Sequence, residues 1–403
     1  MPQIVGVRTT GQVITDERLV RVVDSDIGML EPDIAPLITM LMHLKKRQRT
    51  TSPRFEWYES DYVARWTQNS GDSVANNAAS TTVSVTDGTL FVAGDLFLVP
   101  KAVGSSVAPE ICRVTVVTGN VLTVVRDVGG AGVDIIAADA ALRLLGSSFA
   151  EAAALATAKC KAPTKKTGYT QIDKTACRFS KTAIASEVYG AAQGDRQREH
   201  KIKMEEHKRK LNDTLLFGRA SEVLTAGAEI RTSAGLMSVI STNKVDAGGL
   251  LTRKAFAAFA EQAFEYGQKD TKVLVAPGRL MTALNQWATK FLMVRPGEKK
   301  LGLPMITQVD TGHGTWLVVR DRNLQDGVSG KNGFAGVAFS VDLDEIVYRY
   351  LEANGVNRDT KLTENADQTG GDYVVDEILT EYGYQIKQEK YHATLFNVTD
   401  YSE

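Results

Sequence analysis

The sequence predicts an α+β protein with more than one folding unit, and three observations favour this class. The chain has 403 residues, which exceeds the usual size of one compact domain. Residues 81–148 consist of short β-rich runs separated by Gly, Asn and Asp, as expected for antiparallel hairpins. A long, highly charged helical pattern at Asp195–Phe217 is then followed by alternating helical and strand-like segments.

The composition is that of an ordinary globular protein, with 43% apolar and 24% charged residues. It excludes a collagen-like chain, a wholly disordered chain and a disulfide-rich miniprotein. Lys and Arg together number 47 and Asp and Glu 48, so the formal net charge is −1. A chain with this balance has no overall attraction to nucleic acid or to an anionic membrane, so any such attraction has to be local.

The N-terminal residues show no basic segment followed by an apolar core, so no signal peptide is predicted. The most apolar early stretch, Ile34–Leu44, contains Pro36 and is about half as long as a membrane-spanning helix, so no membrane contact is expected. Cys112, Cys160 and Cys177 form no Cys-x-x-Cys pair, which argues against a zinc knuckle or a redox motif. We expect three buried free thiols in a reducing cytoplasm.

The first fifty residues are expected to form an arm rather than a domain. A short helical segment at Leu37–Met42 precedes a basic run that ends at Arg54, and Phe55–Trp66 then resembles an exposed strand. Two interpretations of the basic run stay open. Either it contacts nucleic-acid phosphates, or it is a solvated linker or a strip that pairs with acidic residues of another subunit, and the second is favoured. The nucleic-acid-facing candidates are Lys45, Lys46, Arg47 and Arg49.

Beyond the β-rich stretch the sequence predicts an alanine-rich helix at Phe149–Ala158 and a polar connector at Lys161–Lys166. A second strand-like segment follows at Tyr169–Ser180. It and Pro53–Trp66 both alternate polar and aromatic side chains, and neither is able to bury two faces within one subunit. A neighbouring chain is therefore expected to cover part of both.

The strongest helix signal is Asp195–Phe217, with Asp195 suited to the N-cap and Gly218 to the C-cap. From Asp195 to Lys210, 11 of 16 residues are charged, and the apolar stripe is narrow. Such a helix is not expected at the centre of a core, so it should lie across a surface and pack by one stripe.

The remaining chain alternates helices and strands. Helices are predicted at Lys254–Tyr266 and after Pro277, and the run Val273–Ala276 is typical of a buried strand. Further strands are expected at Met305–Val309, Thr315–Val319 and Ile346–Tyr350, whereas residues 373–398 give mixed helix and strand signals.

No motif for catalysis is present. The chain has no phosphate-binding loop, no dinucleotide fingerprint and no Gly-x-Ser-x-Gly elbow. His200 and His207 share a helix face, but seven residues separate them by about 10 Å, too far to chelate one metal ion, and both are expected to be solvated. We therefore predict no catalytic, cofactor-binding or metal-binding residue, and no enzyme activity.

A set of segments in a fixed order resembles the major capsid proteins of tailed bacteriophages with the Hong Kong 97-type fold. The resemblance is greatest to the subgroup whose extended loop carries a β-rich insertion. Asp173 departs from that pattern, which more often continues with an aromatic residue. The segments that carry the resemblance are Thr167–Ile172, Ala176–Ala185, Leu215–Gly218, Arg231–Leu236, Val273–Pro277, Thr311–Arg320, Gly370–Tyr373 and Glu377–Val398.

The resemblance implies an α+β Hong Kong 97-like capsid fold with a small all-β insertion domain. Its parts are expected as follows: an N-terminal arm at 1–50, an extended loop at 51–80 and 160–185, the insertion domain at 81–148, a peripheral domain at 186–250 and 341–403 with the spine helix at 195–217, and an axial domain at 251–340.

The implied function is self-assembly into hexamers and pentamers that form an icosahedral shell around the phage genome. The expected partners are other copies of the chain, together with portal, scaffold and decoration proteins, and packaged double-stranded DNA as non-specific contents. No cofactor and no membrane partner are expected. The expected location is the virion capsid, assembled in the host cytoplasm.

The residues expected at contacts between subunits lie on the extended loop and on the spine helix. Two alternatives stay open: a bacterial nanocompartment shell on the same fold, against which the β insertion argues, and an enzyme whose site has no recognisable motif. The expected contact residues are Arg54, Glu56, Trp57, Arg65, Trp66, Arg198, Lys201, Glu205, Lys208 and Arg209.

Overall fold

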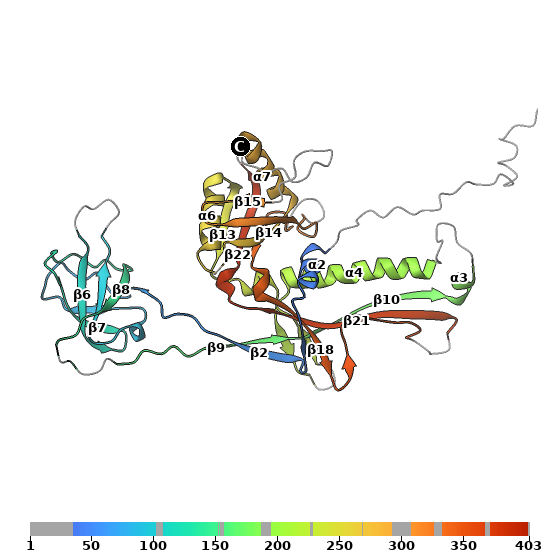
Figure 1. The fold of residues 1–403 in the computed structure, drawn as a ribbon, viewed down its shortest axis with the longest axis horizontal. Helices are drawn as coiled ribbons and strands as arrows, with labels where there is room; N and C mark the ends of the chain where they lie inside the picture. The colour runs from blue at the N-terminus through green and yellow to red at the C-terminus, as the bar shows by residue number, and fades with distance from the viewer. Residues whose placement is uncertain are drawn as a thin grey trace, which may run out of the picture. The chain divides into compact units, whose positions relative to one another are not determined.

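The structure is a computed structural model, and it describes residues 35–101, 108–151, 153, 157–186, 195–225, 229–267, 269–291, 308–325, 333–366 and 371–401. The chain divides into two compact units (Figure 1). The first comprises residues 1–57 and 166–403, and the second comprises residues 58–165. Of the expected N-terminal arm, residues 1–34 lie outside the described residues.

The first unit contains a sheet in the strand order β1-β18-β21-β10, with β19 paired to β18 and β20 to β21. β1 and β18 are parallel, whereas β21 pairs antiparallel with both β18 and β10. The mixed signals near the C-terminus thus resolve as strands. The strands are β1 (Arg47–Thr50), β10 (Gln171–Ser180), β18 (Ile346–Ala353), β19 (Val356–Asn357), β20 (Lys361–Thr363) and β21 (Tyr373–Ile386).

A second sheet of the first unit has the order β13-β22-β17-β14-β16-β15. Its central strand β14 is buried on both faces: Val273 and Val275 belong to one hydrophobic core, and Leu274 and Ala276 to the other. This explains the continuous apolar run of the sequence. The strands are β13 (Lys244–Leu251), β14 (Thr271–Ala276), β15 (Gln308–Asp310), β16 (Thr315–Arg320), β17 (Ala338–Val341) and β22 (Ala393–Tyr401).

The longer helices of the first unit form where the sequence predicts them, whereas the short helices α3 and α5 were not predicted. α2 (Pro36–His43) and the end of α4 (Asp195–Phe217) contribute to the core between the sheets, and α6 (Arg253–Phe264) and α7 (Gly278–Phe291) to the other core. α4 lies along β10 and β21 (Figure 1). Smaller elements are α3 (Lys181–Ala185), α5 (Leu236–Val239), the pair β11 (Ser221–Val223) and β12 (Ile230–Thr232), and the 3-10 turns η3 (Leu343–Glu345) and η4 (Glu389–Tyr391).

Gly218 ends α4 as the sequence predicts. Its N–H donates to the carbonyl oxygen of Thr214 at 2.8 Å, and its own carbonyl accepts from the N–H of Gly235. A Cβ at Gly218 would lie 2.5 Å from the oxygen of Thr214 and 2.7 Å from that of Ser233. Only glycine fits here, because the chain after the helix approaches its last turn so closely.

The second unit is a six-stranded antiparallel sheet in the order β3-β8-β5-β6-β7-β4. Alternate side chains of β5, β6 and β7 are buried in one core. Gly88–Leu90 forms the 3-10 turn η1, in which the Asp87 carboxylate accepts from the N–H of Thr89. The strands are β3 (Trp66–Gln68), β4 (Thr82–Ser84), β5 (Asp95–Val99), β6 (Glu110–Thr118), β7 (Val121–Val125) and β8 (Ala141–Ser147).

A buried ion pair fixes the loops of the second unit. The Arg126 guanidinium donates to both carboxylate oxygens of Glu110, at 2.6 and 2.7 Å, and both side chains are 0% exposed. Arg126 also donates to the carbonyls of Ala75 and Ser80, and Glu110 accepts from the N–H of Asp134. Every charged atom of the pair therefore has a partner, which is the condition for a tolerable buried charge.

The chain passes between the units as a two-stranded ribbon of β2 (Arg54–Glu59) and β9 (Thr164–Tyr169). The expected long strand Pro53–Trp66 is thus shorter: β2 ends at Glu59, and residues 60–65 form no strand.

Two sequence expectations are wrong in this part of the chain. The described residues of the alanine-rich segment, 149–151, 153 and 157–158, are not helical. A helix of about ten residues without an apolar face is marginal, so composition alone does not stabilise it. Cys160 lies in the same coil and is exposed, whereas Cys112 and Cys177 are buried as expected.

No helix among the described residues is long and apolar enough to cross a membrane.

Candidate interaction surfaces

The first turns of α4 are fixed to the sheet by polar contacts. Arg196 donates to both carboxylate oxygens of Asp376 on β21, at 2.7 and 2.6 Å, and Nε2 of His200 lies 2.7 Å from the same carboxylate. Burial alone raises the pKa of Asp376, but Arg196, the N–H of Asn365 and His200 outweigh it and lower the pKa to about 2. Asp376 is therefore a carboxylate at neutral pH and anchors the helix.

His207 is a second polar anchor, two turns further along α4. Its side chain is fully buried, with Nδ1 2.9 Å from the Thr175 hydroxyl on β10 and Nε2 2.7 Å from the Thr380 hydroxyl on β21. Burial lowers its pKa, so the neutral ring is favoured. The expectation that His200 and His207 are solvated is wrong, because the narrow face of α4 that packs on the sheet is partly polar.

Cys177, His200 and Asp376 bring one sulfur, one nitrogen and one oxygen within 4.8 Å of one another. Sequence reasoning missed this cluster, because its members come from three separate elements. Both oxygens of Asp376 already accept from Arg196, whose positive charge opposes a cation at the same place. Burial also raises the pKa of the Cys177 thiol. The cluster therefore serves as a helix anchor.

The charged residues predicted as contacts on α4 face the surface. Arg198 pairs with Asp195 at 3.0 Å, and Lys208 pairs with Glu205 at 2.9 Å, both one turn apart in the same helix. Lys201 is exposed, and Arg209 is partly exposed. Such solvated pairs contribute little to the stability of one subunit, so these side chains remain available for contacts with another molecule.

The five contact residues expected on the extended loop fall into two groups. Arg54 and Glu56 pair at 3.2 Å on β2, where the Trp57 ring stacks on Phe55 with a centroid separation of 6.0 Å. Arg65 and Trp66 belong to the second unit. There the guanidinium of Arg143 lies over the half-exposed Trp66 ring, 5.4 Å from its centroid. Arg54, Glu56 and Trp57 thus lie in the first unit, and Arg65 and Trp66 in the second.

The basic run is partly neutralised within the chain. Lys46 pairs with Asp344 at 2.6 Å. Arg47 pairs with Asp359, and its guanidinium lies 4.9 Å from the centroid of Tyr350. Lys45 and Arg49 are exposed, Lys45 in a left-handed turn with φ 54° and Arg49 on β1. Only part of the run is thus left to attract phosphates.

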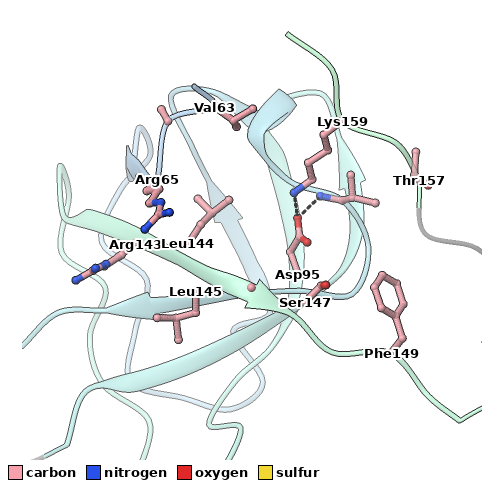
Figure 2. A pocket seen from close by; sticks show the side chains of 13 residues that line it. Val63, Arg65, Asp95, Arg143, Leu144, Leu145, Ser147, Phe149, Thr157 and Lys159 are labelled. Atoms are coloured by element: carbon pink, nitrogen blue, oxygen red, sulfur yellow. Dashed lines mark hydrogen bonds and ion pairs between the residues drawn. The ribbon is translucent and has the colours of Figure 1, made fainter. Parts of the chain in front are cut away.

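The second unit has an open cavity of about 560 Å³ between β8, residues 63–65 and the segment that contains Thr157 and Lys159 (Figure 2). Its apolar lining includes Leu145 and Phe149, and its cations include Arg65. The single carboxylate of the described lining, Asp95, accepts from the Val92 N–H at 2.7 Å and pairs with Lys159. The acidic group is thus held in a structural role, and the described lining contains no nucleophile paired with a base.

Two other buried groups have strongly shifted pKa values. Burial lowers the pKa of Lys272 to about 8, and its ammonium donates to the carbonyls of Ala263, Tyr266 and Tyr391. Burial also lowers the pKa of His392 to about 4, and its Nδ1 accepts from the N–H of Asp342 at 3.3 Å. Both side chains lie in the interior of the first unit, where Nε2 of His392 has no hydrogen-bond partner among the described residues.

Comparison with known proteins gives the family directly. The profile of the SU10 major capsid protein family matches residues 4–399. No curated protein sequence matches the chain.

Among solved structures, the capsid of a native GTA particle is similar over 98% of this chain and 100% of that chain, with 7% identity and a TM-score of 0.50. A structure of Gordonia phage Cozz covers 100% of this chain and 98% of its own, with 9% identity and a TM-score of 0.48. One of Mycobacterium phage Ogopogo covers 97% and 99%, with 12% identity and a TM-score of 0.45.

The family match spans nearly the whole sequence, and the mixed α/β fold is that of the GTA particle capsid. A highly charged helix lies on an open sheet, and charged and aromatic side chains remain at the surface. Both features agree with a subunit whose surface is partly covered by neighbouring subunits. The chain therefore belongs to the SU10 major capsid protein family and is a structural subunit of a phage capsid shell.

Proposed function

We propose that the chain assembles into hexamers and pentamers that close into an icosahedral shell around packaged double-stranded DNA. The observation that carries the proposal is α4: 23 residues long, with only five buried side chains, all in its second half. Such a helix suits a thin shell wall, because it has too few buried side chains to form the centre of a thick core. Copies of one chain join through repeated contacts into closed rings, and many weak contacts sum to a stable particle.

We assign the parts of the Hong Kong 97-like fold as follows. The sheet of β1, β18, β21 and β10 with α4 is the peripheral domain, and α4 is its spine helix. The sheet of β13 to β17 and β22 with α6 and α7 is the axial domain. The β2–β9 ribbon is the extended loop, and the sheet of β3 to β8 is the insertion domain. Strand pairing supports the inclusion of β13 and β22, at 244–251 and 393–401, in the axial domain.

The ten surface residues on the loop and α4 are proposed as contacts between subunits. The pairs Arg54–Glu56, Arg198–Asp195 and Lys208–Glu205 are solvated, which supports this role. Assembly is proposed to occur in the host cytoplasm with portal, scaffold and decoration proteins as partners, and the chain is proposed to have no catalytic activity.

Charge reversal on the ribbon tests the contacts. Arg54 is exposed and pairs only weakly with Glu56. The Arg54→Glu variant should fold with an unchanged circular dichroism spectrum and melting temperature but form at least tenfold fewer particles, counted by electron microscopy. The matched control is Arg113→Glu, which reverses an exposed charge on β6 of the second unit. Full particle yield from Arg54→Glu would contradict the assignment of the ribbon.

A further inference from the structure

A cavity of about 490 Å³ lies at one edge of the second sheet of the first unit. Strands β14 and β16 are parallel and pair from Thr271 with Thr315 to Ala276 with Arg320, so their carboxyl ends meet there. Helix α7 begins beside the same edge, at Gly278. In open α/β sheets this edge is the usual place for a ligand.

The charged residues in the described lining of this cavity, here called the arginine cavity, are Arg279, Arg320, Arg322 and Asp321. The Asp321 side chain is fully buried, and its carboxylate accepts from Asn212 and from the N–H of Asn323, each at 2.8 Å. Arg279 donates from Nη1 to the carbonyl of Val398 at 2.8 Å.

Arg320 and Arg322 are both exposed, and within the described part of the chain neither side chain forms an ion pair or a hydrogen bond. Guanidinium groups are the preferred protein partners of phosphate, because their planar N–H pairs match two oxygens at once. Two such groups, which lack a partner among the described residues and lie next to a third, suit an oxyanion ligand.

The start of α7 adds to the positive potential. A Cβ at Gly278 would lie 3.4 Å from Nη2 of Arg320, so this guanidinium lies against the first turn of the helix. That turn contains no acidic residue. The backbone N–H groups of a helix start carry partial positive charge, which repels a guanidinium unless an anion lies between them.

We propose that the arginine cavity binds a phosphate group, supplied either by free inorganic phosphate or by the backbone of a nucleic acid. The inference goes beyond shell assembly, which does not require this cavity. Both sources present the same oxyanion, so the experiment below separates them.

The test uses the full-length chain in three forms: wild type, Arg320→Gln with Arg322→Gln, and a control with Arg113→Gln and Arg219→Gln. The control removes two exposed charges outside the cavity. Inorganic phosphate is titrated by calorimetry, and a short double-stranded DNA by fluorescence anisotropy, both at constant ionic strength with chloride as the background anion.

We expect wild type and control to bind phosphate equally, and the Arg320→Gln/Arg322→Gln variant to bind at least tenfold more weakly. A parallel loss of DNA binding in this variant alone assigns the nucleic-acid backbone as the source, and unchanged DNA binding assigns free phosphate. The proposal is overturned if wild type binds neither probe, if the control loses as much as the variant, or if acetate competes as well as phosphate. Electron microscopy of the variant should still show particles, which separates this test from that of assembly.

Discussion

At the residue scale, several buried polar side chains have complete sets of partners, although Nε2 of His392 and Oδ1 of Asn212 have no hydrogen-bond partner among the described residues. Glu110 and Arg126 illustrate this, since their ion pair is fully enclosed and also holds the carbonyls and N–H groups of the adjacent loops. His207 and Lys272 likewise have hydrogen-bond partners at every donor or acceptor that the structure places in the interior. Removing one member of such a set leaves the others desolvated and unpaired, which costs more than the set contributes.

The Arg126→Met variant should therefore destabilise the second unit by about 3–5 kcal/mol, because it leaves the Glu110 carboxylate buried without its countercharge. Chemical denaturation of the unassembled chain, followed by near-ultraviolet circular dichroism, measures this. Arg198→Met, which breaks a solvated pair on α4, should cost less than about 1 kcal/mol. Equal effects of the two substitutions would show that the Glu110–Arg126 pair is not buried as described.

The free energy of unfolding should depend on pH through the buried side chain of His392. Burial lowers the pKa of His392 from its ordinary value of 6.5 to about 4. Between these two pH values the imidazole is protonated in the unfolded chain but neutral in the folded chain. The stability contribution is therefore complete above pH 6.5 and is lost as the pH falls toward 4. Between pH 7.5 and 5 the free energy of unfolding should decrease by about 2 kcal/mol from this group. His207 adds a decrease in the same direction.

Denaturation curves at several pH values measure the effect. The pKa values of Asp376 and Glu389 are lowered from 3.8 and 4.5, so their contributions are lost only below this window. His392→Asn keeps an acceptor for the Asp342 N–H and removes the proton uptake. Across this window its free energy of unfolding should fall by about 2 kcal/mol less than that of the wild type. Asp213, whose pKa burial raises to about 6, acts in the opposite direction in both forms. An unchanged slope in this variant would assign the effect to other groups.

At the scale of elements, α4 has two parts with different fixation. Its second half enters the hydrophobic core through Leu211, Leu215 and Leu216, whereas Arg196 and His200 fix its first turns to Asp376. The position of the helix was predictable, because Asp195 and Gly218 mark its ends and the apolar stripe is local in the sequence. The anchors were not, because Asp376 follows His200 by 176 residues and no local pattern links them.

In the other elements, too, features set by the local sequence were predictable, and features set by distant contacts were not. The buried strand β14 and the helices α6 and α7 follow from local apolar patterns, and all three form as predicted. Residues 373–398 gave mixed signals, because Tyr382 and Tyr384 gain their burial only from the strands and helix that pack on β21. The cavity residues Arg279, Arg320 and Arg322 carried no signal, since the sheet edge that gathers them depends on the pairing of β14 with β16.

Because the two halves of α4 are fixed by different contacts, loss of the Asp376 charge should affect only the first half. Asp376→Asn removes the charge that holds Arg196 and His200, so the first turns of α4 should exchange their amide hydrogens at least tenfold faster. Residues 211–217 should keep their protection, because their core packing is unchanged. Hydrogen–deuterium exchange with mass spectrometry resolves the two parts. The matched substitution Glu205→Gln removes only a solvated pair within α4, and equal exchange in both variants would contradict the anchor.

At the scale of the whole molecule, the formal charge of −1 fits a subunit that meets many copies of itself, because a large net charge would make every contact repulsive. The 47 basic and 48 acidic groups allow opposite charges to meet across interfaces. Local positive charge remains at Lys45 and Arg49 and in the arginine cavity. We therefore propose that any attraction to a nucleic acid arises from these small regions.

Electron microscopy of the purified chain, combined with light scattering across salt and protein concentration, tests assembly most directly. The account predicts closed particles of uniform size in which image reconstruction finds hexamers and pentamers. Particles from infected cells should contain DNA rather than a cargo enzyme. A chain that stays monomeric under all these conditions and forms no shells would contradict the central claim.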